Sequence, residues 1–144
     1  MNQFLNKGKV YLLFLLLFGA CAGSKKVNYK NPKSVTLAFY KALANNDYER
    51  AKQLGTSETI KVLSMLQNLH DLLPEEEQRA AKEEGALQLK YLKKATCLLG
   101  EKGSAETATC QVCCDENGVS STAPLTLRKE NRRWLIHITK ETLE

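Results

Sequence analysis

The chain has 144 residues, of which 43% are hydrophobic and 26% are charged, and its formal net charge is +5. This length is enough for one domain and too short for two ordinary ones. The basic residues are scattered in pairs such as Lys93-Lys94 and Arg132-Arg133, with no aromatic residues interleaved. Such a distribution is typical of a solvated surface, so we expect no nucleic-acid partner.

The first 21 residues have the pattern of an export signal. A flank with two lysines precedes the apolar run 10–18, and the small residues Gly19 and Ala20 stand directly before Cys21. A basic flank, a short apolar stretch and small residues before a cleavage site form a secretory signal. The cysteine after the small pair makes the segment resemble a bacterial lipoprotein signal. This resemblance implies cleavage after residue 20, a diacylglyceryl group on the Cys21 thiol and a further acyl chain, such as palmitate, on the new amino terminus.

Two other interpretations of this segment are an uncleaved transmembrane helix and a simple cleaved signal. The apolar run through Ala20 has eleven residues, whereas a helix that spans a bilayer core needs about 20, so the first is disfavoured. The second, in which Cys21 carries no lipid, stays open. On the lipoprotein interpretation, residues 1–20 are a removed signal peptide, residues 21–30 a flexible tether and residues 31–144 a single domain.

Helical patterns occupy the first part of the domain. Asn31-Pro32 is an N-cap followed by proline at the first helical position, and an apolar stripe at helical spacing continues to Leu43. Asp47 is expected to cap a short second helix, and Gly55 is expected to end it.

A third helix is expected to start at Thr56 or Ser57. Its predicted buried side consists of Ile60, Leu63, Leu66, Leu69 and Leu73. Pro74 either kinks this helix or opens a separate turn, and the three glutamates after it suit a helix start. We expect Gly85 to be the C-terminal stop.

From Leu87 onward the hydrophobic period changes to two, which predicts antiparallel strands. Two-residue turns are expected at Gly103-Ser104, Asn117-Gly118 and Glu130-Asn131. All three turns place the same apolar set on one face of the sheet: Ala95, Cys97, Leu99, Ala108, Cys110, Val112, Ala123, Leu125, Leu127, Trp134, Ile136 and Ile138.

The three turns also predict which residues lie opposite each other. The first turn places Cys97 opposite Cys110, the second places Cys110 opposite Leu125, and the third places Leu127 opposite Trp134. A slip of one residue at any turn would move that strand's apolar residues to the other face. The agreement between independent signals predicts an α+β fold, with helices packed on an antiparallel sheet.

Two parts of the chain resemble a known domain. Residues 31–54 contain an apolar helix, then Asn46-Asp47 and an aromatic-x-x-alanine at Tyr48 and Ala51, and a late strand contains Trp134. Together they resemble a bacterial lipoprotein domain of unknown function that is similar to the nuclear-transport-factor-2-like (cystatin-like) superfamily. The resemblance covers about residues 31–140. It implies a curved sheet wrapped around helices as a cone, and it implies no activity, because the superfamily includes enzymes, binders and assembly modules.

Four cysteines follow Cys21, namely Cys97, Cys110, Cys113 and Cys114. A zinc site needs paired Cys-x2-Cys units, and the chain has one such unit, so we expect no metal and no other cofactor. Cys97 and Cys110 fall opposite each other and are candidates for a disulfide in an oxidising compartment. Free buried thiols are the open alternative.

No catalytic residue is expected. The predicted inner face holds no acid, histidine or amide that could act as a base, and His70 and His137 have no arranged nucleophile beside them. The candidate pocket lining is Tyr40, Tyr91 and Trp134, because their rings are apolar and two of them end in a hydroxyl.

The sequence therefore favours a non-catalytic module that is held to the bacterial cell membrane or outer membrane by a lipid anchor. Its domain would lie on the periplasmic or extracellular side, where it binds an unknown protein partner or associates with itself. The alternative is a carrier or sensor of a small apolar ligand in the cone, because such pockets are mostly apolar. An enzyme is a third interpretation.

Overall fold

The computed structural model describes residues 26–100, 106–113 and 122–143. The expected signal peptide with Cys21, the turns at Gly103-Ser104 and Asn117-Gly118, and Cys114 lie outside these ranges.

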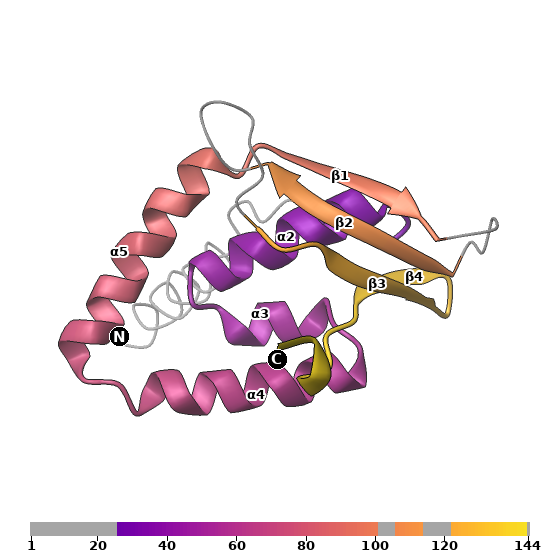
Figure 1. Ribbon diagram of the computed structural model, residues 1–144. Helices are drawn as coiled ribbons and strands as arrows, with labels where there is room; N and C mark the ends of the chain where they lie inside the picture. The colour runs from indigo at the N-terminus through magenta and orange to yellow at the C-terminus, as the bar shows by residue number, and fades with distance from the viewer. Residues whose placement is uncertain (1–25, 101–105, 114–121, 144) are drawn as a thin grey trace, which may run out of the picture.

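The described residues form helices first and strands afterwards, which confirms the predicted α+β class (Figure 1). The helices are α2 (Pro32–Ala44), α3 (Tyr48–Gln53), α4 (Ser57–Asp71) and α5 (Glu75–Tyr91), with a short 3-10 helix η2 (Lys140–Leu143) near the C-terminus. The strands are β1 (Lys94–Leu99), β2 (Thr107–Cys113), β3 (Leu125–Glu130) and β4 (Arg133–Ile136). They form an antiparallel sheet in the order β1-β2-β3-β4 that does not close on itself.

The predicted helix starts are confirmed by their caps. The side chain of Asn31 accepts a hydrogen bond from the Lys33 amide at 3.0 Å, with Pro32 in the first helical position. The side chain of Asp47 accepts one from the backbone of α3 at 3.0 Å, and that of Thr56 accepts one from the backbone of α4 at 3.4 Å. Each of these bonds satisfies an amide that has no partner inside its own helix.

The prediction that Gly85 ends a helix is wrong, and so is the strand predicted from Leu87. Helix α5 continues through both residues to Tyr91. Gly85 is the point where α5 crosses α2, since a Cβ added there would overlap the carbonyl oxygen of Ala44. The residues after Gly85 are mostly strong helix formers, and this propensity outweighs the short alternation.

The first two predicted registers are confirmed in the described strands. Cys97 pairs with Cys110, and Cys110 pairs with Leu125. The third register is wrong, because Leu127 pairs with Ile136 and not with Trp134.

The third turn lies one residue later than predicted. Its central residues are Asn131 and Arg132, with φ angles of 49° and 64°. Positive φ at both central positions is the requirement of a type I′ hairpin turn. The pairing moves by two residues, and because the side-chain period of a strand is also two, the apolar face is unchanged.

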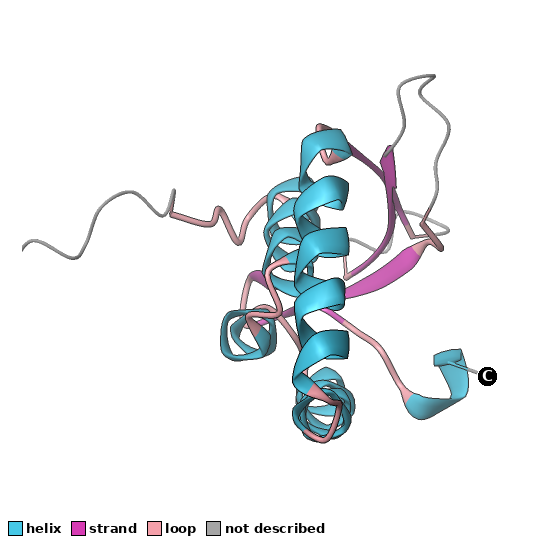
Figure 2. Ribbon diagram, turned by 90° about the vertical axis from the view of Figure 1, so that its left-hand side faces the viewer, coloured by secondary structure: helices cyan, strands magenta, loops and turns pink. Residues whose placement is uncertain are grey.

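The apolar face of the sheet packs against α2, and the helices α2 to α5 lie on one side of the sheet (Figure 2). The core cluster is Val35, Phe39, Ala42, Ala51, Leu54, Leu63, Ala108, Cys110, Leu127, Trp134 and Ile136. Full burial of one large aliphatic side chain in such a core stabilises a fold by about 1.5–3 kcal/mol. Two residues of the predicted face are exceptions, since Leu99 and Ala123 are exposed.

The outer edge of β4 is covered by neighbouring backbone. The Trp134 amide donates a hydrogen bond to the Tyr29 carbonyl, and the Ile136 amide donates one to the Leu54 carbonyl, each at 2.8 Å. Strand β1, on the other edge of the sheet, pairs with β2 alone among the described strands. The segment before α2 is thereby fixed beside β4.

Candidate functional site

Cys97 and Cys110 are joined by a disulfide bond between β1 and β2. Their Cα atoms are 4.1 Å apart. The Gly100 amide donates to the Thr107 carbonyl, so the alternation of an antiparallel ladder makes the Cys97–Cys110 pair a non-hydrogen-bonded one. Side chains in such pairs stand closest together, which suits the bond. In the part of the chain that the structure describes, no group of three or more metal-ligating side chains comes together.

The structure brings Tyr40 and Tyr91 to one cavity of about 290 Å³. It lies beside α2, the C-terminal part of α5 and residue 122, and its other described lining residues are Glu84, Leu87, Gln88, Leu92 and Thr122. The Tyr40 hydroxyl donates a hydrogen bond to the Ala123 carbonyl at 3.2 Å. This cavity lies beside helix α5 and not within the apolar face of the sheet.

Trp134, the third predicted lining residue, does not line this cavity. Its side chain is 4% exposed and belongs to the core cluster. The Nζ atom of Lys129, its partner on β3, lies 5.6 Å from the centre of its ring. The indole is therefore a core group with a cation above it.

The two histidines take part in structural contacts. The Nδ1 atom of His137 lies 3.1 Å from the Thr56 hydroxyl. The ring of His70 lies 5.7 Å from that of Tyr48, and its Nδ1 atom is 3.5 Å from a carboxylate oxygen of Asp71. Burial, and then the negative charge of Asp71, raise the pKa of the Tyr48 hydroxyl above its ordinary value, so it stays neutral near pH 7.

Helix α4 departs most from its predicted burial. Of the five residues expected on its buried side, Leu63 alone is buried, and Ile60, Leu66, Leu69 and Leu73 are exposed. The reason is that α4 packs on α3 through another stripe, which includes Gln67 and His70. Figure 1 shows that α5 then turns away from the end of α4 and runs toward β1.

This geometry leaves an apolar surface at the C-terminal end of α4. We call Met65, Leu66, Leu69, Leu72 and Leu73 the α4 apolar surface. Met65, Leu66 and Leu69 lie in the last two turns of α4, with Leu69 three and four residues after the other two, so they share one helix face. Leu72 and Leu73 directly follow the last residue of the helix. Their exposed fractions run from 37% for Leu66 to 81% for Leu72. Four exposed acids, Asp71, Glu75, Glu76 and Glu77, stand next to it in the chain.

Sequence reasoning missed this surface because it assigned the leucines of α4 to the core. A signal for it exists in the sequence. Between residues 60 and 73 the apolar residues cover more than one helix face, whereas a helix that packs on a single neighbour buries one stripe.

No protein-family model, curated protein or solved structure matches the chain. Within the described residues, no helix has both the length and the hydrophobicity that a bilayer crossing requires. The function must therefore be argued from the surfaces themselves.

Proposed function

We propose that this chain is a lipid-anchored module of the bacterial cell envelope that binds another protein through the α4 apolar surface. The observation that carries the proposal is this group of five exposed apolar side chains, which lie close together in the chain at the C-terminal end of α4. Contiguous exposed apolar patches mark interaction sites on soluble domains.

The sequence before the domain supports the anchor. The apolar run ending at Gly19-Ala20-Cys21 resembles a lipoprotein signal. Each buried methylene of an acyl chain contributes about 0.8 kcal/mol, so two or three chains on one residue would hold the protein on a membrane permanently. Metabolic labelling with a fatty acid tests this part. Label is expected on the wild type and not on Cys21→Ser, and equal label on both would contradict the anchor.

The four acids at the C-terminal end of the α4 apolar surface indicate the chemistry of the partner. Asp71 and the glutamates 75–77 make its border acidic, which disfavours an anionic lipid surface and favours a partner with basic residues. An amphipathic helix with apolar side chains three and four residues apart and basic residues at its edge has this complementarity.

Site-specific crosslinking in cells tests the binding surface. A photo-reactive amino acid in place of Leu69 is compared with one in place of Leu98, which is 72% exposed on β1 and serves as the matched apolar control. We expect a discrete protein adduct from position 69, weakened when Leu72→Ser is added. An adduct of twice the mass of the chain identifies self-association as the form of binding. Equal yields from both positions, or no adduct from position 69, would refute the proposal.

A relationship to the nuclear-transport-factor-2-like superfamily, with a cone-shaped domain, is part of the same proposal. The order of elements supports it, because capped helices precede an antiparallel meander whose apolar face packs on α2. The sheet itself is open, with β1 and β4 as its edges.

A carrier of a small apolar ligand is the second candidate. The cavity at Tyr40 and Tyr91 favours it, because apolar walls are combined with a few polar groups such as Glu84 and Gln88. Native mass spectrometry of protein extracted from its own membranes decides between the two. A retained small molecule that is lost in Tyr91→Ala supports the carrier, and its absence from the wild type contradicts it.

A further inference from the structure

A groove of about 520 Å³ lies between the segment at residue 26, helix α2 and the start of α3. On α2 its lining residues include Ser34, Leu37 and Lys41, whose spacings of three and four residues place them along one side of the helix. Lys26 and Arg50 lie on its other walls. The groove is distinct from both the α4 apolar surface and the Tyr40–Tyr91 cavity.

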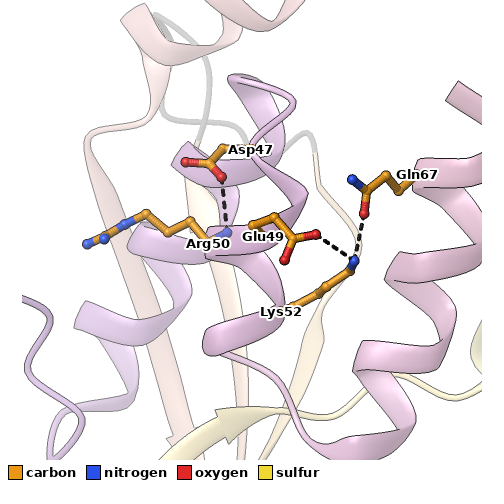
Figure 3. A network of polar contacts seen from close by, with 5 residues as sticks. All are labelled: Asp47, Glu49, Arg50, Lys52 and Gln67. Atoms are coloured by element: carbon orange, nitrogen blue, oxygen red, sulfur yellow. Dashed lines mark hydrogen bonds and ion pairs between the residues drawn. The ribbon is translucent and has the colours of Figure 1, made fainter. Parts of the chain in front are cut away.

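Three cations border this groove, and none of them is held in an ion pair by another described residue. Lys26, Lys41 and Arg50 make no ion pair within the described part of the chain, where the ion pairs found are Lys52 with Glu49 and His70 with Asp71. Figure 3 shows the guanidinium of Arg50 directed away from Glu49 and Lys52.

The acid among the described lining residues is Asp47. One of its carboxylate oxygens accepts a hydrogen bond from the backbone amide of Arg50, as the cap of α3. Three positive charges and one negative charge around a concave surface give a positive potential that attracts anions.

The other walls of the groove include apolar side chains. Val27, Leu37 and Ala38 line it beside the cations. Lys26, Val27 and Arg50 also line an adjoining cavity of about 290 Å³. A site with a cationic rim and an apolar wall fits an amphiphile, which is a molecule with an anionic group next to hydrocarbon.

The position of the groove in the chain indicates where such an amphiphile comes from. Lys26 follows Cys21 by five residues, and five extended residues span at most about 18 Å. If Cys21 carries lipid, the groove therefore lies within reach of the headgroups of the same bilayer.

We propose that this groove binds the phosphate headgroup of an anionic phospholipid, with its glycerol and first methylenes against the apolar wall. Arg50 contacts the phosphate through its planar fork of donors, and Lys41 and Lys26 add point charges. Bound in this way, a lipid fixes the orientation of the domain on the membrane. The inference that the ligand comes from the bilayer next to the protein rests on the lipid anchor proposed above. The inference that the groove binds an anionic amphiphile does not depend on that anchor.

Native mass spectrometry of the full lipidated protein in detergent tests the proposal. The probes are phosphatidylglycerol, phosphatidylcholine and inorganic phosphate, each titrated separately. We expect one phosphatidylglycerol to bind, with affinity at least about tenfold higher than that of phosphatidylcholine, because the second lipid carries no net charge. Equal binding of the two lipids, or binding of inorganic phosphate without phosphatidylglycerol, would overturn it.

Variants connect the binding to the groove. Arg50→Gln and Lys41→Gln are each expected to weaken phosphatidylglycerol binding by about tenfold. Arg50→Lys, which keeps the charge and loses the planar fork, is expected to lose less. Lys61→Gln on α4 removes the same charge outside the groove and is the matched control. Undiminished binding in both groove variants, or an equal loss in the control, would also overturn the proposal.

The lipidation state of Cys21 separates this proposal from the anchor. The mass of the purified wild type shows directly whether Cys21 carries lipid. If it does not, while phosphatidylglycerol still binds and Arg50→Gln still weakens the binding, the anchor is refuted and the groove stands. If Cys21 is lipidated and phosphatidylglycerol does not bind, the groove is refuted and the anchor stands.

Discussion

Replacing Gly85 with alanine is expected to destabilise the domain, although alanine is the better helix former. Inside an exposed helix, the change from glycine to alanine stabilises by about 1 kcal/mol. At Gly85 the added Cβ would overlap the carbonyl oxygen of Ala44 and lie 2.8 Å from its carbonyl carbon. Both are backbone atoms, so no side-chain rotation relieves the overlap, and α5 must move away from α2.

Overpacking of this kind destabilises by about 1–3 kcal/mol, and a clash with backbone belongs at the top of that range. Subtracting the gain in helix propensity leaves a net loss of about 2 kcal/mol. Urea unfolding followed by circular dichroism gives the free energy of unfolding of the wild type and of Gly85→Ala. Ala86→Gly, at the exposed neighbour on the same helix, is the control and should lose about 1 kcal/mol. A Gly85→Ala protein as stable as the wild type would refute the close crossing of α5 and α2.

Three further predictions concern stability. The Cys97–Cys110 disulfide closes a loop between residues 13 apart in the sequence. Its reduction should lower the free energy of unfolding by about 3 kcal/mol. Two reactive thiols at these positions in the unreduced protein would contradict the bond. Thr59→Val removes a buried hydroxyl that donates to the Ile136 carbonyl at the end of β4 at 2.7 Å and accepts from the Ile138 amide at 2.8 Å. This variant should lose about 2 kcal/mol in urea unfolding, with Thr59→Ser losing less. The hydrogen bond from the Lys52 ammonium, and then its positive charge, lower the pKa of Glu49 below its ordinary value of 4.5. The stabilisation from this pair is therefore present above pH 4.5, and it is lost as the pH falls through the lowered pKa. Carboxyl titration by NMR should show this lowered pKa and its return toward 4.5 in Lys52→Gln, and an unchanged pKa in that variant would contradict the assignment.

The features predicted correctly are those that depend on a few consecutive residues. The caps at Asn31, Asp47 and Thr56 need only a short polar side chain before a helix. The pairing of Cys97 with Cys110 follows from one turn and the period of two in a strand. The third turn was predicted one residue too early, because the two residues that adopt positive φ are Asn131 and Arg132 and not Glu130 and Asn131.

The features that were missed depend on contacts between distant parts of the chain. In the sequence alone, Gly85 has the features of a helix stop. In the fold it lies against the backbone of Ala44, where the absence of a Cβ permits α5 to cross α2. The cations of the groove lie in three separate elements, so no spacing in the sequence connects Lys26, Lys41 and Arg50. The prediction that Trp134 lines the pocket is wrong for the same reason, since its ring is buried in the core.

The bond between Cys97 and Cys110 has a consequence for the places in a cell where this chain can fold safely. Strand β1 is an outer strand, and the disulfide ties it to its neighbour β2. Without the disulfide, β1 can detach from β2 and expose the backbone donors and acceptors of β2. These groups can then form hydrogen bonds with strands of other molecules. Protein in a reducing compartment should therefore aggregate more readily than protein in an oxidising one, where the disulfide forms.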